Sequence, residues 1–208
     1  MKRHGLKSVG IASLSVFAAA PASAHHVMGG RLPSTFAEGF LSGLGHPVIG
    51  ADHLAFLVAI GLIVGVQRLP LFLPGLFVVA MAVGVWMHAQ AISVSAAEAI
   101  VGMSVLLVGI LIALGRALPI GGWVAVFVIG GLFHGYAFGE SIFGAEATPL
   151  AAYLLGLAVI QGALTVGIAL VARAIGAWST PQLAPRLVGA AIAGVGLSVL
   201  LAQLFPST

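Results

Sequence analysis

Two histidines and an aspartate stand close together just before an apolar segment. They are His46, Asp52 and His53, and residues 54–66 that follow carry no charge. An ionisable group at membrane depth costs roughly 2.5 to 3.5 kcal/mol even on the mildest scale, so such residues are interpreted first as functional. Imidazole nitrogens and a carboxylate oxygen together suit a divalent transition metal. The spacing therefore predicts a metal site, and the alternative is that Asp52 only caps the helix beginning beside it.

A second polar group lies farther along the chain, in the stretch 133–140. Its ionisable members are His134 and Glu140, and Gly135 and Gly139 stand four residues apart. Two small residues at this spacing let a neighbouring helix approach closely. Beside the first motif, His134 and Glu140 are interpreted as further metal ligands. The alternative is a hydrogen bond between helices for His134 and a solvated position for Glu140.

Other candidates each stand alone on an apolar stretch. Glu98 is a candidate metal ligand or proton acceptor, against simple placement at the membrane interface. His88 has a similar status. Gln161 is expected to hydrogen-bond between helices rather than to lie on a pathway for the metal. His25 and His26 would begin a mature chain cleaved after residue 24, where they could chelate a metal or lie in a disordered tail.

The composition is that of an integral membrane protein. Of 208 residues, 61% are hydrophobic and 6% charged, whereas a soluble domain carries about 25% charged residues. Residues 1–24 combine a basic start, an apolar stretch and a small-residue site, which predicts a cleaved signal peptide ahead of one domain, 25–208. Without residues 1–24, five arginines balance five acidic residues, so the basic isoelectric point indicates no nucleic-acid partner. The absence of cysteine excludes disulfides and thiolate metal sites.

Six stretches are apolar and long enough to cross a bilayer, which takes roughly 20 residues each. The predicted fold is therefore an all-α bundle of six transmembrane helices. A short re-entrant or interfacial helix is predicted within 34–45, broken from the first span by Gly43, Gly45 and Pro47. Such a broken helix can present backbone carbonyls to an ion. The predicted spans are 50–67, 70–89, 95–115, 118–138, 149–172 and 185–205.

Charge placement predicts the orientation of these spans. A cleaved signal peptide would leave the mature N-terminus outside, and six spans would return the C-terminus to the same side. The predicted inner loops and their borders then hold the arginines, in agreement with the positive-inside rule, namely Arg68, Arg116, Arg173 and Arg186. The candidate ligands gather at the opposite, outer side: His46, Asp52, His53, His88, Glu98, His134 and Glu140.

These motifs resemble those of the HupE/UreJ family of hydrogenase and urease accessory membrane proteins, and the resemblance extends over essentially the whole chain. The family's first motif, a histidine followed after five residues by Asp-His, stands here as His46, Asp52 and His53. The resemblance implies a nickel or cobalt permease in the bacterial cytoplasmic membrane, with both mature termini periplasmic. It also implies that these three residues and His134 are functional.

The family's second motif is changed in this chain. Its pattern is Phe-His-Gly-x-Ala-His-Gly followed closely by a glutamate. Phe138 stands where that pattern has a second histidine, and Glu140 comes one place early. Glu146 could substitute for the displaced glutamate.

We therefore expect a secondary transporter, rather than an enzyme, that takes up Ni²⁺ or Co²⁺ as its substrate and uses no cofactor. Its partners would be the lipid bilayer and the metal ion, and its Gly- and Ala-rich faces fit either a monomer or a homo-oligomer. A divalent cation entering a cell gains about 4.6 kcal/mol per 100 mV, which is two charges at about 2.3 kcal/mol each. Two alternatives stay open: an intramembrane zinc-dependent enzyme with the same residues, and a non-transporting metal-binding protein for metalloenzyme assembly.

Overall fold

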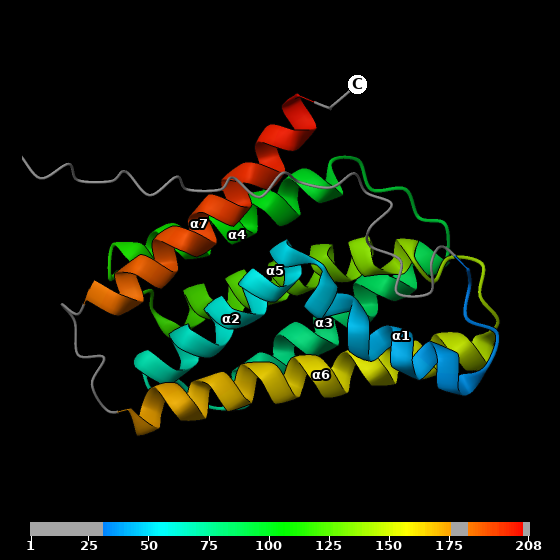
Figure 1. The fold of residues 1–208 in the computed structure, drawn as a ribbon, viewed down its shortest axis with the longest axis horizontal. Coiled ribbons are helices and arrows are strands. Elements are labelled where there is room, and N and C mark those ends of the chain that lie inside the picture. Colours follow the sequence, from blue (N-terminus) through cyan, green and yellow to red (C-terminus); the bar gives the residue numbers. More distant parts are fainter. Residues whose placement is uncertain (1–30, 176–182, 206–208) are drawn as a thin grey trace, which may run out of the picture.

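The computed structural model describes residues 31–175 and 183–205, which form seven α-helices and no strand (Figure 1). The predicted signal peptide, His25 and His26 lie outside the described residues. The last six helices match the six predicted apolar stretches within a few residues at each end. The helices are α1 (Phe36–Ile49), α2 (Ala51–Val66), α3 (Leu73–Ala89), α4 (Ala97–Ala113), α5 (Ile120–Glu140), α6 (Ala147–Ala174) and α7 (Leu183–Leu204).

Three helices, α5, α6 and α7, are long and apolar enough to cross a membrane. The pair α1 and α2 passes the same test together, although the two helices are bent by 80° at the break between them. Helices α3 and α4 are apolar but shorter, with 17 residues each. Length and composition thus give three clear candidate spans, and four if the bent pair is one span.

The first helix runs farther than the sequence predicts. Gly43, Gly45 and Pro47 were expected to break it, but all three lie inside α1, and the break falls at Gly50. Packing explains the difference for Gly43, because a Cβ there would collide with the backbone of α6 at Tyr153. A small residue at such a contact favours the helix through close packing, and this outweighs its weak intrinsic propensity.

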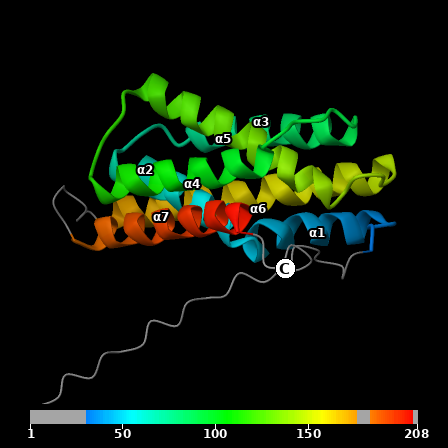
Figure 2. The ribbon, with the colours of Figure 1, turned by 90° about the horizontal axis from the view of Figure 1, so that it is seen from above.

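The helices pack in pairs along lines of small residues. Helices α3 and α5 run parallel, since Gly131 meets Phe77 and Gly139 meets His88. The close approach predicted for Gly139 is confirmed. Helices α4 and α7 run antiparallel and lie side by side in both views (Figures 1 and 2). Helix α6 is the longest and contacts both α1 and α2.

Helix α2 occupies the centre of the bundle. It contacts α1, α3, α4, α6 and α7, and Phe56, Ile60 and Val64 are completely buried. A helix that is apolar all round is expected to be enclosed by others. Any polar residue at the start of α2 is therefore carried into the interior, and this is where His53 lies.

Candidate functional site

Three histidines from three helices form one buried group. His46 comes from α1, His53 from α2 and His134 from α5, with exposed fractions of 4%, 6% and 0%. The ring of His53 lies between the other two, at centroid distances of 6.1 Å from His46 and 5.0 Å from His134. We call these three residues the histidine group.

The break between α1 and α2 positions two members of this group. Gly50 has extended backbone angles, φ −74° and ψ 111°, which end α1 and let α2 start in a new direction. His46 lies about one turn before the break and His53 about one turn after it. Figure 1 shows α1 and α2 descending from this apex towards opposite ends of α6. The bend therefore brings both histidines to one point inside the bundle.

Asp52 lies in the first turn of α2, whose N-cap residue, Gly50, has no side-chain capping hydrogen bond. Oδ1 of Asp52 accepts a hydrogen bond from the backbone N–H of His53 at 2.9 Å, so this side chain bonds a backbone N–H at the start of the helix, as considered from the sequence, without being the N-cap. The same oxygen lies 4.0 Å from Nε2 of His53. Two ligands at about 2.1 Å from one ion are roughly 3 to 3.5 Å apart. If Oδ1 of Asp52 and Nε2 of His53 moved closer together by less than about 1 Å, the two side chains could therefore bind one cation.

A chain of hydrogen bonds couples the tautomers of His134 and His53. The hydroxyl of Ser104 donates to the carbonyl oxygen of Val101 at 2.7 Å and also lies 3.0 Å from Nε2 of His134. With its single proton on that bond, Ser104 accepts a hydrogen from Nε2 of His134. Nδ1 of His134 then accepts from Nδ1 of His53 at 2.9 Å. In this arrangement the lone pair of the His53 ring lies on Nε2, the atom that is 4.0 Å from Oδ1 of Asp52.

His46 is oriented in the same manner by α6. The hydroxyl of Tyr153 lies 3.0 Å from the carbonyl oxygen of Phe138, 3.0 Å from the hydroxyl of Ser141 and 3.3 Å from Nδ1 of His46. When its single proton goes to the carbonyl, Nδ1 of His46 donates to Tyr153 and the lone pair of His46 lies on Nε2. Ligating histidines commonly donate their second nitrogen to such an outer partner. In this arrangement of protons, the lone pairs of both histidines at the break lie on Nε2.

The ring of Phe138 packs against the histidine group. Its centroid lies 5.0 Å from that of His46 and 4.2 Å from that of His53. Phe138 is 1% exposed. This is the position at which the family pattern has a second histidine, so this chain has an apolar ring where an imidazole would contact both ligands.

The predicted carboxylates lie at helix ends. Glu98 is in the first turn of α4, Glu140 ends α5 and Glu146 precedes α6, and all three side chains are exposed. Within residues 31–175 and 183–205, no three His, Asp or Glu side chains are arranged to hold one ion. Glu98 and Glu140 therefore do not complete a closed cage with the histidines in this structure.

Two further candidates are placed differently from the histidine group. His88 packs against Tyr136 and Phe143, at centroid distances of 4.6 and 5.7 Å. Gln161 is fully buried in α6, and neither of its amide atoms has a hydrogen-bond partner among the described residues. The expectation that Gln161 hydrogen-bonds between helices is therefore wrong for this part of the chain.

Ser104 and Tyr153 were not predicted as site residues. Each is a hydroxyl side chain on a mostly apolar predicted span, which is the only signal the sequence carries for them.

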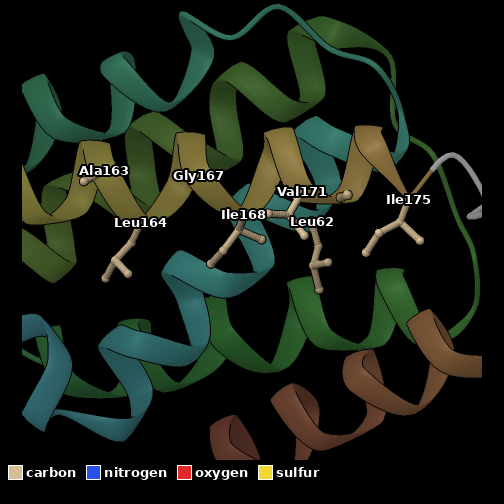
Figure 3. A pocket seen from close by; sticks show the side chains of 8 residues that line it. Leu62, Ala163, Leu164, Gly167, Ile168, Val171 and Ile175 are labelled. Atoms are coloured by element: carbon tan, nitrogen blue, oxygen red, sulfur yellow. The ribbon is translucent and has the colours of Figure 1, made fainter.

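A cavity of about 320 Å³ elsewhere on α6 is lined by apolar residues such as Leu164 and Ile168, with Leu62 of α2 (Figure 3). Its lining offers no side chain that binds a metal.

Comparison with known proteins matches almost the whole chain to one family. The model described as HupE / UreJ protein matches residues 13–199. Protein HupE from Rhizobium leguminosarum bv. viciae is 31% identical over 169 residues, which cover 79% of this chain and 85% of that protein. No solved structure matches the chain. The family match includes all the residues of the histidine group.

Proposed function

Because this chain belongs to the HupE/UreJ family, we propose that it is a membrane permease that takes up Ni²⁺ or Co²⁺. The observation that carries the proposal is the convergence of His46, His53 and His134 from three helices at a break between two of them. Broken helices within a bundle are a recurrent way to build an ion site at membrane depth. Buried imidazoles with a neighbouring carboxylate suit these metals.

The metal would be bound by the two histidines at the break. Nε2 of His46 and Nε2 of His53 supply nitrogen, and Asp52 supplies a carboxylate oxygen next to His53. His134 lies behind His53 and holds it through the bond between their Nδ1 atoms. Donors that are not closed around a fixed ion suit transport, because an ion that is bound too tightly cannot leave.

The transport path would cross a bundle of six spans. Helices α3 and α4, at 17 residues each, meet the lower limit of about 17 residues for a span. With α1 and α2 as one bent span, the six would run alternately up and down, which agrees with the parallel packing of α3 and α5 and the antiparallel packing of α4 and α7. The histidines would face the periplasm of a bacterial cytoplasmic membrane. The membrane potential would then draw a divalent cation inward.

Metal flux into proteoliposomes tests this proposal. The full chain is reconstituted, an inside-negative potential is imposed, and uptake of Ni²⁺, Co²⁺ and Zn²⁺ is compared. We expect uptake of Ni²⁺ or Co²⁺ that a His46→Ala/His53→Ala variant reduces by at least about 100-fold, since it loses both nitrogen ligands. His88→Ala is the matched control, because that ring packs against Tyr136 and Phe143 instead.

The outcomes separate the alternatives. Stoichiometric metal binding without flux under the imposed potential would contradict the permease and favour an accessory protein. Tight Zn²⁺ binding that no potential displaces would favour a zinc-dependent enzyme. Equal loss of flux in His88→Ala and in the double variant would show that the histidine group has no special role.

A further inference from the structure

Gln161 is a buried polar side chain with no partner within the described residues. It is 0% exposed, and both Oε1 and Nε2 lack a hydrogen bond. A buried polar group without a hydrogen-bond partner destabilises the folded state, so such groups are rare unless they serve a function. Thr165, one turn farther along α6, is equally buried, but its hydroxyl donates to the carbonyl oxygen of Gln161 at 2.7 Å. Of these two buried polar side chains, only Gln161 is without a hydrogen-bond partner among the described residues.

The packing of α6 against the bent pair locates this amide. Earlier along α6, Leu157 meets α1 at Gly43, and later Thr165 meets α2 at Gly61. Gln161 stands four residues from each of these contacts and on the same face of the helix. It therefore faces the inside of the angle between α1 and α2, the angle shown opening towards α6 in Figure 1.

The histidine group lies in the same angle. Tyr153 of α6 contacts His46 through its hydroxyl, and Gln161 follows eight residues later. At 1.5 Å per residue this is about 12 Å farther along the helix, in the direction of the proposed inner side. The last carbonyls of a helix have no intrahelical partner, and α1 ends at the apex of this angle. Gln161 thus lies on the inner side of the metal ligands.

We propose that the Gln161 carboxamide is a second, neutral oxygen station for the divalent cation, placed inside the bend between α1 and α2. This rests on the proposed permease function. The carbonyl oxygen of the amide would take the cation, with water still bound to it, after it leaves the histidines. An uncharged oxygen ligand holds such an ion weakly, which favours onward movement.

Flux and binding measured on the same variants test this station. Gln161→Leu removes the amide and retains an apolar side chain of similar size. We expect metal flux into proteoliposomes to fall at least tenfold, while equilibrium binding of Ni²⁺ or Co²⁺ to the solubilised full chain is unchanged, because the histidine ligands are intact. Thr165→Val is the matched control on the same face, and it should keep normal flux, since its hydroxyl bonds only within its own helix.

A second variant keeps the test decisive if Gln161→Leu does not fold. Gln161→Glu has nearly the same shape but adds a charge, so we expect a lower KM for the metal together with a lower maximum flux. Normal flux in Gln161→Leu, or unchanged KM and maximum flux in Gln161→Glu, would overturn the proposal and leave the amide as a site for a water molecule only. Absence of flux in the unmodified chain would instead overturn the permease function, and this proposal with it.

Discussion

The two ends of the helix bundle carry opposite kinds of polar side chain. At one end the starts of α4 and α6 lie near the ends of α3 and α5 (Figure 1). We call this the histidine end, and the helix ends here hold the exposed residues Glu98, Glu140 and Glu146. At the other end the end of α6 lies near the starts of α3, α5 and α7. This arginine end holds the cationic residues Arg68, Arg116, Arg173 and Arg186.

The polar groups of the two ends are engaged differently. At the arginine end, side chains on two helices donate hydrogen bonds to the loop between α2 and α3. Arg173 of α6 donates to the carbonyl oxygen of Leu69, and Trp123 of α5 donates to Oε1 of Gln67 at 2.7 Å. At the histidine end, the rings of His53 and His134 are bonded to one another through their Nδ1 atoms, and Nδ1 of His46 lies 3.3 Å from the hydroxyl of Tyr153. One end therefore holds imidazoles and carboxylates, whereas the other holds arginines. This difference agrees with the proposed binding of the cation at the first end and its release at the second.

We expect the largest effect in thiol labelling of the two ends, because only the histidine end should face the periplasm. The chain has no cysteine, so a single one can be placed at Ser95→Cys, at the histidine end, or at Ala117→Cys, at the arginine end. Both positions are exposed. A membrane-impermeant thiol reagent should label the first in intact spheroplasts and the second only after lysis.

The reverse labelling pattern would invert the proposed direction of uptake. Labelling of both positions in intact spheroplasts would contradict the spanning of the intervening helix α4. Either result would contradict the proposal that the metal binds at the histidine end and is released at the arginine end.

The hydrogen bond from Ser104 should matter next most. Ser104→Ala removes the acceptor for Nε2–H of His134 and frees that histidine, and through it His53, to change tautomer. Loss of an outer partner of a metal-binding histidine typically lowers affinity 10- to 100-fold. We expect a loss in this range for Ni²⁺ or Co²⁺ binding by calorimetry, with a change in the ¹⁵N shifts of the His53 ring.

Two variants control for general effects at Ser104. Ser104→Thr keeps the hydroxyl and should restore both affinity and ¹⁵N shifts. Ser198→Ala removes a hydroxyl that makes the same type of bond to its own helix, to Val195 at 2.8 Å, without a histidine beside it. Equal losses in Ser104→Ala and Ser198→Ala would show that the effect comes from helix stability alone.

Sequence patterns predicted the helices well because a long uncharged stretch has few alternatives in a membrane. They also predicted that His46, His53 and His134 share one side of the bundle, which follows from counting spans. A break before the first long helix was predicted at Gly43 to Pro47, but it lies at Gly50, because packing of Gly43 against α6 keeps α1 helical past the expected end. The roles of Ser104 and Tyr153 depend on which face each helix turns inward, and helices apolar on all sides carry no signal for that.

The exposed carboxylates should have the smallest effect, because solvent screens them. Glu98→Gln and Glu140→Gln remove charge that attracts cations to the histidine end. Both side chains are exposed, and at 0.15 M salt such charges act over only about 8 Å. We expect KM for metal uptake to rise roughly two- to fivefold at low ionic strength, with maximum flux unchanged, and the difference to vanish at about 0.5 M salt.

The control variant Arg116→Gln, at the opposite end, should leave KM unchanged. A loss beyond about 20-fold that persists at high salt would make Glu98 or Glu140 a direct ligand, because a bond to the metal is not screened by dissolved ions.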